Sequence, residues 1–413
     1  MAGSASQKSS DIARVRAFLE ERDFKQALDL ARTYARQSPR VLQWHAIQAQ
    51  ALSAMQRPLE AIEILEGAME QAPAQPKLLG LARAIAFQHG HFDKAEKFGA
   101  QLLALDPTDQ KVSNLNLLSG LAMGRWREIA KRDADLPSSS KAVVYARDTE
   151  RAEREFPSLI RAWEASLGVY PAPIVSAHAA GHPKVTMIQY WSQGALPRDM
   201  AIVFDLWEKL AGRLGIGPIE LFSRKTAGDW IKEHAPEFAP AFDAAFHYAM
   251  ESDIFRIAYA SKRPCIYVDA DSWPLPEAQS ILQAAMQHGK TMLYLRSYRP
   301  WILNGLFMAY PRCGFIKELV EQTQHLVVSD MPQTHATIEA TFGPTRYNNV
   351  LRELLGRPAS SSAGSITHGL SSLTHGDLEL SITHEAALAS VKPPFSLAYK
   401  ATDGNWKGHG SLA

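Results

Sequence analysis

The chain has 413 residues, of which 46% are hydrophobic and 21% charged, and its formal net charge is +1. This composition is that of a globular protein, and the length predicts two or three domains. The balanced charge gives no indication of a nucleic-acid partner, two cysteines are too few for a disulfide framework, and no apolar run is long enough for a membrane span. We therefore expect a cytoplasmic protein.

A period of 34 residues runs through residues 20–135. Three columns of residues keep this interval: Phe24, Pro58, Phe92 and Trp126; Ala27, Ala61, Ala95 and Ile129; and Pro39, Pro73 and Pro107. The pattern predicts a unit of two helices joined by a short turn, with the proline ending the second helix. Alanine in one column is typical of a site where two helices approach closely.

The segment "GHFDKAEKFGAQLLALDP" (90–107) resembles the second helix of the tetratricopeptide repeat, whose period is also 34. About three and a half such units cover residues 8–135. The resemblance implies a helical solenoid that docks a protein partner or a second copy of the chain. The alternative is that the solenoid only braces the rest of the chain.

The pattern changes after the repeats. Residues 136–183 contain a charged helical stretch and then "GVYPAPIVSAHAAGHP", which is typical of a linker. From residue 184 onward, strand-like runs (184–191, 216–223 and 265–271) alternate with helical runs (199–215 and 239–261). This alternation predicts an α/β domain with a largely parallel sheet over residues 184–413. A Ser/Gly-rich stretch, 356–376, predicts a mobile loop within it.

Two carboxylates follow the apolar run "CIYV" in "PCIYVDADSWP". Residues two apart in a strand face the same side, so Asp269 and Asp271 could converge at the carboxyl end of a strand, where α/β sheets bind ligands. The same triplet at Asp133 and Asp135 lies in a polar stretch and is expected to be solvated.

The helix expected before that strand carries two charges in its apolar stripe. Asp253 and Arg256 are three residues apart, so their side chains are neighbours on the helix surface. Charges in such a stripe are costly unless they are paired or bound to a ligand. The pair is either a buried structural ion pair or part of the same pocket as Asp269 and Asp271.

These features together resemble the signature of the DXD-motif sugar-transferase family of GT-A fold, which includes capsular-polysaccharide and initiating mannosyltransferases. The matching residues lie in "ESDIFRIAYASKRPCIYVDADSWPLP": Ser252, Asp253, Ile254, Arg256, Tyr267, Asp269 and Asp271. Weaker similarity extends over residues 182–408. The expected fold class is therefore α + α/β, a tetratricopeptide solenoid followed by a GT-A domain with a Rossmann-like, mainly parallel sheet.

The resemblance implies a metal-dependent hexosyltransferase that moves a sugar from a UDP- or GDP-sugar to a glycan or protein acceptor, with retention, in surface or capsular polysaccharide synthesis. It implies Mn²⁺ or Mg²⁺ as cofactor. The roles it implies are as follows: Asp253, Arg256, Asp269 and Asp271 catalytic; Asp269, Asp271 and Asn405 at the metal; and Trp191, Tyr267, Asp269 and Trp406 at the nucleotide-sugar.

Two alternatives remain open. Arg263 and Pro264 stand where the family has Gly-Gly, so the chain could be a repeat scaffold with a degenerate transferase domain. A haloacid-dehalogenase-like phosphatase also places Asp-x-Asp after an apolar strand, with the first Asp as nucleophile. That family needs a later acidic pair, and the only aspartates after Asp271 are not adjacent: Asp330, Asp377 and Asp403.

Overall fold

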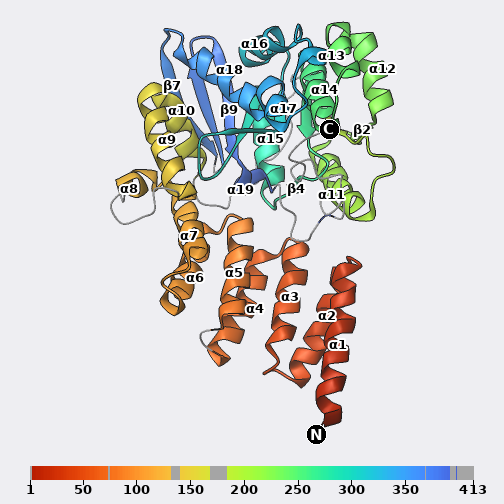
Figure 1. The fold of residues 1–413 in the computed structure, drawn as a ribbon, viewed down its shortest axis with the longest axis vertical. Coiled ribbons are helices and arrows are strands. Elements are labelled where there is room, and N and C mark those ends of the chain that lie inside the picture. Colours follow the sequence, from red (N-terminus) through yellow and green to blue (C-terminus); the bar gives the residue numbers. More distant parts are fainter. Residues whose placement is uncertain are drawn as a thin grey trace. The chain divides into compact units, whose positions relative to one another are not determined.

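The computed structural model describes residues 2–72, 75–131, 140–167, 184–367, 369–390 and 397. The chain divides into two compact units, of which the first is built from residues 1–147 and the second from residues 148–391. Figure 1 shows the elements of each unit.

The first unit is a stack of antiparallel helices. Its elements are α1 (Ala2–Glu20), α2 (Phe24–Gln37), α3 (Leu42–Ala54), α4 (Pro58–Gln71), α5 (Pro76–Gln88), α6 (Phe92–Leu105), α7 (Gln110–Ala122) and α8 (Trp126–Lys131). The first column of the 34-residue period supplies the first residue of α2, α4, α6 and α8. The alanine column is fully buried at Ala27, Ala61 and Ala95, so close helix packing explains it.

The turns inside the helix pairs form a further column with the same interval. Arg22, Gln56, Gly90 and Gly124 have φ angles of 65°, 59°, 79° and 77°. Glycine adopts this left-handed conformation without strain, whereas in arginine and glutamine the Cβ atom lies too close to the backbone and the conformation is strained. The repeat therefore fixes a backbone shape at these four positions, although the first two residues do not reveal it.

The prediction that a proline ends the second helix of each unit agrees with the helix ends that the structure describes. Helices α2 and α6 end two residues before Pro39 and Pro107, and Pro73 lies outside the described residues. Beyond α8, residues 132–139 and 168–183 are likewise outside, including Asp133 and Asp135. Between these segments lie α9 (Lys141–Glu155) and α10 (Pro157–Ser166).

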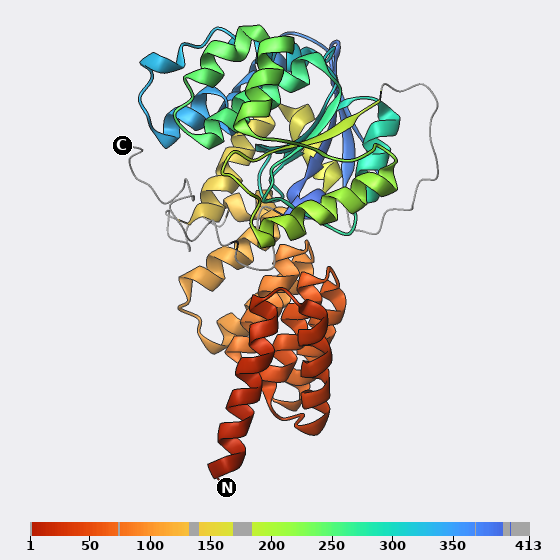
Figure 2. The same ribbon diagram turned by 90° about the vertical axis from the view of Figure 1, so that its right-hand side faces the viewer.

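The second unit is a mixed sheet with helices on both faces (Figure 2). Its strands are β1 (Thr186–Tyr190), β2 (Glu220–Phe222), β3 (Cys265–Val268), β4 (Trp273–Pro274), β5 (Thr291–Leu295), β6 (Ile302–Ala309), β7 (Ser361–Thr367), β8 (Leu370–His375), β9 (Leu378–His384) and β10 (Ala389–Ser390). Its helices, besides α10, are α11 (Arg198–Leu214), α12 (Arg224–His234), α13 (Ala239–Asp243), α14 (Tyr248–Lys262), α15 (Ala278–His288), α16 (Gly314–Thr323), α17 (His335–Thr341), α18 (Pro344–Gly356) and α19 (Glu385–Leu388), with short 3₁₀ turns at Pro236–Phe238 and Val328–Asp330.

The order of the main sheet is β2-β1-β3-β6-β5-β9-β8-β7, and β4 pairs with β10. Pairs β1–β2, β1–β3 and β5–β9 are parallel, and the other neighbours are antiparallel. Within the described sheet, β6 and β8 therefore run against the other six strands, which fits the expected α/β class. Because β1, β3, β5 and β9 share one direction, their carboxyl ends lie at one edge.

Helix α10, although it lies in the predicted connector, packs on β7, β8 and β9 of the second unit. The indole N–H of Trp163 donates to the backbone oxygen of Arg296 at 2.9 Å, and the ring of His384 lies 3.0 Å from the oxygen of Ser166. These buried polar contacts make α10 part of the second unit, so that unit begins well before residue 184.

Two local predictions are wrong. The run 239–261 is not one helix, because α13 ends at Asp243 and α14 begins at Tyr248, where the ring of His247 accepts a hydrogen bond from Ala249 N at 3.1 Å. The expected mobile loop 356–376 contains the hairpin β7–β8, whose backbone pairing orders it despite its loop-like composition.

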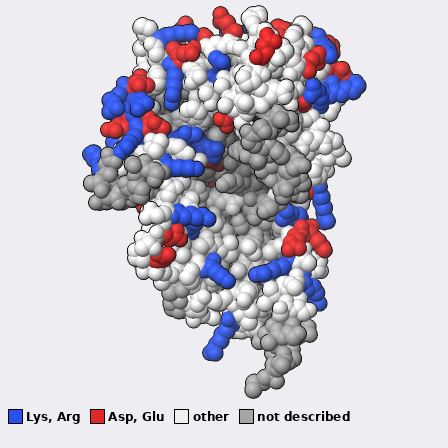
Figure 3. Space-filling model, in the orientation of Figure 1, with Lys and Arg blue, Asp and Glu red and all other residues white. Residues whose placement is uncertain are grey.

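On the face drawn in Figure 3, basic and acidic side chains are interspersed, as the near-neutral charge predicts. Within the described residues, no helix is both long and apolar enough to cross a membrane.

Candidate active site

Arg256 is the centre of a buried polar cluster between α14 and β3. Its side chain is 4% exposed. Atom Nη2 donates to Asp269 Oδ1 at 2.9 Å and to Ser252 Oγ at 2.8 Å, and it lies 3.2 Å from Asp253 Oδ1. One guanidinium thus holds a helix carboxylate and a strand-end carboxylate together. The predicted pair Asp253/Arg256 therefore faces the same place as Asp269.

Tyr267 contacts both the guanidinium of Arg256 and the carboxylate of Asp269. Its ring lies under the guanidinium, with Arg256 Cζ 4.2 Å from the ring centroid, and its hydroxyl donates to Asp269 Oδ1 at 2.9 Å. The same hydroxyl is 2.7 Å from Ser252 Oγ. Tyr267 is fully buried, so it orients Asp269 rather than presenting a surface of its own.

Strand β6 supplies two residues that the sequence analysis did not nominate. Asn304 donates from Nδ2 to Asp253 Oδ1 at 2.7 Å, and its backbone oxygen accepts from Arg256 Nη1. The backbone oxygen of Gly305 accepts from Asp269 N at 2.6 Å. A Cβ on Gly305 would lie 2.4 Å from Asp269 Oδ2, so any other residue there would have to displace that carboxylate. In the sequence, the Asn-Gly pair within an otherwise apolar strand could have indicated that Asn304 and Gly305 belong to the site.

The electrostatics of the cluster follow from burial and from its neighbouring charges. Burial raises the pKa of Asp253 to about 7, and the charge of Asp269 adds to this, while Arg256 and the hydrogen bond from Asn304 oppose it. Burial alone would lower the pKa of Arg256, but Asp269, Tyr267 and Asp253 outweigh it and raise that pKa. Asp253 can therefore gain or lose a proton near neutral pH beside a permanently charged guanidinium.

Asp269 and Asp271 lie at the carboxyl end of β3, in a turn rather than in the strand. The strand ends at Val268, and Ser272 N donates to Asp269 O at 3.0 Å to close the turn. Strand alternation therefore does not determine where the two carboxylates point. Both residues are partly exposed, and the side chain of Asp269 is 35% exposed.

Trp191 follows β1 directly and lies at the same edge of the sheet, because β1 and β3 are parallel neighbours. Its backbone N–H donates to the backbone oxygen of Phe222 at 2.8 Å, and the residue is 9% exposed. Asn405 and Trp406 lie outside the described residues.

The oxygen donors of the turn fit a hard divalent cation. Within the described part of the chain, no group of three or more His, Cys, Asp or Glu is close enough to hold a metal ion. In the turn, Asp269 and Asp271 provide carboxylate oxygens of the kind that Mg²⁺ and Mn²⁺ prefer. Mg²⁺ sites of this kind are completed by substrate phosphates and water, so two protein carboxylates are sufficient.

A second buried acid fixes the start of α14. Glu251, which is 3% exposed, accepts from the hydroxyl of Tyr190 and pairs with Arg224. These contacts tie β1 and α12 to the helical turn that carries Asp253, so the helix cannot rotate without breaking them.

The backbone of Arg263, the first residue of the Arg-Pro pair after α14, is not strained. Arg263 ends α14 with φ −135° and ψ 143°, an extended conformation open to any residue and favoured before proline. Its guanidinium lies 2.8 Å from His234 Nε2. Glycine is needed instead at Gly343, where a Cβ would lie 2.7 Å from the Cα of Glu339.

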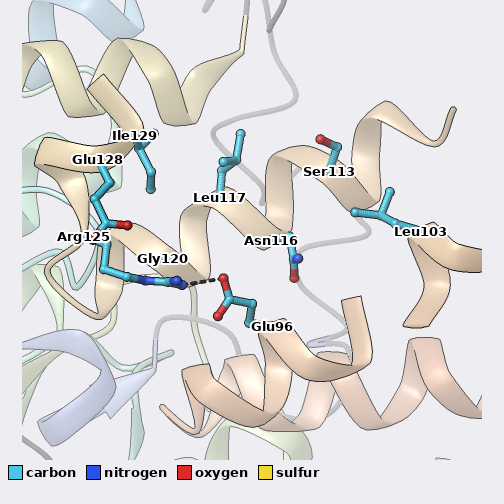
Figure 4. A pocket seen from close by; sticks show the side chains of 9 residues that line it. All are labelled: Glu96, Leu103, Ser113, Asn116, Leu117, Gly120, Arg125, Glu128 and Ile129. Carbon is cyan, nitrogen blue, oxygen red and sulfur yellow. Dashed lines mark hydrogen bonds and ion pairs between the residues drawn. The ribbon is translucent and has the colours of Figure 1, made fainter. Parts of the chain in front are cut away.

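A small cavity lies in the first unit, between α6, α7 and α8 (Figure 4). Its volume is about 150 Å³, and an ion pair of Arg125 with Glu96 crosses one end. Small-molecule sites usually measure several hundred Å³. The cavity is therefore of a size to take a side chain rather than a nucleotide-sugar.

Comparison with known families recognises the first unit. Residues 52–116 match the family model of the tetratricopeptide repeat. The match covers the region from the end of α3 into α7, so the helices with the 34-residue period are a repeat of this kind. Such repeats commonly present surfaces that bind other proteins. No curated protein matches the chain.

Proposed function

We propose that the second unit is a metal-dependent glycosyltransferase of GT-A fold that moves a sugar from a UDP- or GDP-sugar to a glycan or protein acceptor. The observation that carries this proposal is the buried Arg256 that joins Asp253 to Asp269, with Asp271 in the same turn. These are the residues that the sequence resemblance nominates. Their convergence at the carboxyl end of parallel strands supports a ligand site there.

Asp271 and Asp269 would hold Mn²⁺ or Mg²⁺, and the bound ion would offset the negative charge that builds on the leaving diphosphate. Arg256 and Tyr267 hold Asp269 in one orientation through its Oδ1. Asp253, whose burial raises its pKa to about 7, can accept or donate a hydrogen bond at a sugar hydroxyl. Trp191 would stack on the base, and Asn405 and Trp406 would act on the metal and the leaving phosphate.

The proposal includes retention at the sugar carbon and a role in surface or capsular polysaccharide synthesis in the cytoplasm. We assign no nucleophile. The repeats would bring an acceptor protein, an assembly partner or a second copy of the chain to the transferase.

A repeat scaffold with an inactive transferase domain is the second candidate, and the match of residues 52–116 to the tetratricopeptide repeat is compatible with it as well. The unstrained backbone at Arg263 removes one reason for inactivity. Both candidates use the repeats for docking, so nucleotide binding separates them.

Calorimetric titration with UDP, GDP and ADP, with and without Mn²⁺, tests the proposal. We expect Mn²⁺-dependent binding of UDP or GDP that Asp271→Asn weakens at least about tenfold. Asp205→Asn is the matched control, because Asp205 is 57% exposed on α11 and, among the residues described, forms its ion pair with Lys209 one turn away. Absence of nucleotide binding would favour the inactive scaffold, and phosphate release from p-nitrophenyl phosphate would favour the phosphatase.

A further inference from the structure

We propose that Ser361 of β7 and His375 of β8 form a nucleophile and its general base, and that Ser361 takes an acyl group from a carboxylic ester. We call the two residues the Ser–His pair. The pair lies on the β7–β8 hairpin, away from the Arg256 cluster. The inference does not depend on the proposed sugar transfer.

The register of the hairpin brings the two side chains together. Ser361 and His375 lie directly opposite each other in the antiparallel pairing of β7 with β8. Gly376 N donates to Ser360 O at 3.0 Å, so the next pair along, Ser361 with His375, is a non-hydrogen-bonded pair. Opposite side chains are closest in such pairs. Ser361 Oγ consequently lies 2.6 Å from His375 Nδ1.

The second ring nitrogen of His375 determines which atom is the base. Nε2 lies 2.8 Å from the backbone oxygen of Arg357, which can only accept a hydrogen bond. In the neutral ring Nε2 therefore carries the proton, and the lone pair of Nδ1 faces Ser361. The backbone oxygen of Arg357 thus has the orienting role that a carboxylate has in other serine–histidine sites.

Helix α10 holds the hydroxyl of Ser361 in position. Ser158, which is 3% exposed, donates from its Oγ to Ser361 Oγ at 3.0 Å. Ser361 Oγ therefore accepts one hydrogen bond and can donate its own proton to His375. Helix α10 packs on β7 and β8 (Figure 1). The nucleophile, its base and the groups that orient them form one chain of hydrogen bonds.

Ser361 is open to a reagent, although the side chains beside it are buried. The residue is exposed, and β8 is the only strand that pairs with β7 among the described residues. In a non-hydrogen-bonded pair, the backbone N–H of an edge residue points away from the neighbouring strand. The N–H of Ser361 can therefore donate to the oxyanion that forms when its Oγ attacks a carbonyl carbon, as the N–H of the nucleophile does in serine proteases.

A second serine–histidine contact in the same unit provides a comparison. Ser297 Oγ lies 3.3 Å from His384 Nδ1, and His384 Nε2 lies 3.0 Å from a backbone oxygen. Both residues are at most 2% exposed, so no reagent reaches them. A contact that only fastens two elements has no need of exposure, whereas Ser361 combines a shorter contact with an open surface.

The proposed reaction is an acyl transfer. Ser361 Oγ forms a bond to the carbonyl carbon, its proton moves to His375 Nδ1, and the bond from that carbon to the leaving oxygen breaks. The leaving group takes the proton from Nδ1 and departs as an alcohol. Water then attacks the acyl-serine with His375 again as base, which releases a carboxylic acid. The open strand does not select the acyl group, so a small ester with a good leaving group is the substrate class that fits.

Peptide mapping by tandem mass spectrometry tests the inference on the full-length protein. The protein is treated briefly with p-nitrophenyl acetate or, separately, with diisopropyl fluorophosphate, whose leaving group is fluoride. We expect an acetyl group and a diisopropylphosphoryl group, respectively, on Ser361. His375→Gln should slow both modifications at least about 100-fold. Ser361→Ala should abolish modification of this peptide and leave Mn²⁺-dependent nucleotide binding unchanged.

Ser362 is the matched control, because it is exposed on the same strand and lies opposite Thr374 instead of a histidine. Ser297 is the control for a buried contact, and we expect neither serine to be modified. Equal modification of Ser362, an unchanged rate in His375→Gln, or no modification of Ser361 overturns the inference and leaves the contact as a fastening of the hairpin. The comparison of Ser361 with Ser362 uses the wild type, so it decides the question even if His375→Gln does not fold.

Discussion

Replacement of Asp253 by Asn should change how stability depends on pH. The structure raises the pKa of this carboxyl from 3.8 to about 7, chiefly because it is buried. The folded state therefore binds this proton more tightly than the unfolded state, and the contribution of Asp253 to wild-type stability falls as pH rises from about 4 to about 7. At about 1.4 kcal/mol per pH unit, the full loss is about 4 kcal/mol.

Asparagine cannot titrate, and its side-chain oxygen can still accept the hydrogen bond from Asn304. Between pH 5 and pH 8, the free energy of unfolding of Asp253→Asn minus that of the wild type should therefore rise by about 3 kcal/mol. Burial lowers the pKa of His384 to about 4, which gives an opposite slope at low pH. This slope is the same in both proteins and cancels in the difference.

Urea unfolding followed by tryptophan fluorescence, with EDTA present, measures this difference. Seven of the nine tryptophans follow residue 148, so the signal reports mainly on the second unit. Asp229→Asn on the exposed surface of α12 is the control, and its free energy of unfolding should show the same pH dependence as that of the wild type. If the free energy of unfolding of Asp253→Asn depends on pH in the same way as that of the wild type between pH 5 and pH 8, the argument that burial raises the pKa of the Asp253 carboxyl is refuted.

Three further outcomes are expected. Gly305→Ala should weaken Mn²⁺-dependent nucleotide binding at least about tenfold in calorimetry, because its Cβ displaces Asp269, whereas Gly212→Ala, in open space on α11, should bind normally. Burial lowers the pKa of His89 to about 4, so this residue should cost the first unit about 3 kcal/mol of stability as pH falls from 6.5 to 4. Circular dichroism should show a clearly smaller loss in His89→Gln, in which the partly buried His91 still titrates. Gln56→Gly should stabilise the first unit by about 1 kcal/mol, because φ there is 59°, and an unchanged or lower melting temperature contradicts this.

The repeats were predictable because their constraint is local and recurs. An aromatic residue or proline at the start of every second helix and alanines at the helix contact produce a period visible in the sequence. The turn column was not visible at Arg22 and Gln56, because neither residue type signals a left-handed conformation. Only Gly90 and Gly124 carry that information.

The site was predictable where a charge interrupts an apolar stripe, as at Asp253 and Arg256. The part of the site that a strand distant in the sequence supplies was not predictable. Asn304 and Gly305 reach the cluster only because β6 pairs antiparallel with β3, and nothing local announces that pairing. For the same reason the composition of the Ser/Gly-rich segment 356–376 predicts a loop, whereas its order comes from the pairing of β7 with β8 and of β8 with β9.

The central claim is that Asp271 and the Arg256 cluster serve sugar transfer from a nucleotide-sugar. The most direct measurement is chromatographic detection of UDP or GDP released from a panel of UDP- and GDP-sugars in the presence of Mn²⁺. We predict release by the wild type, loss of release when EDTA is added, and a decrease of at least about 100-fold in Asp271→Asn, with Asp205→Asn unchanged. Release by Asp271→Asn at the wild-type rate, or no release from any donor, would contradict the account.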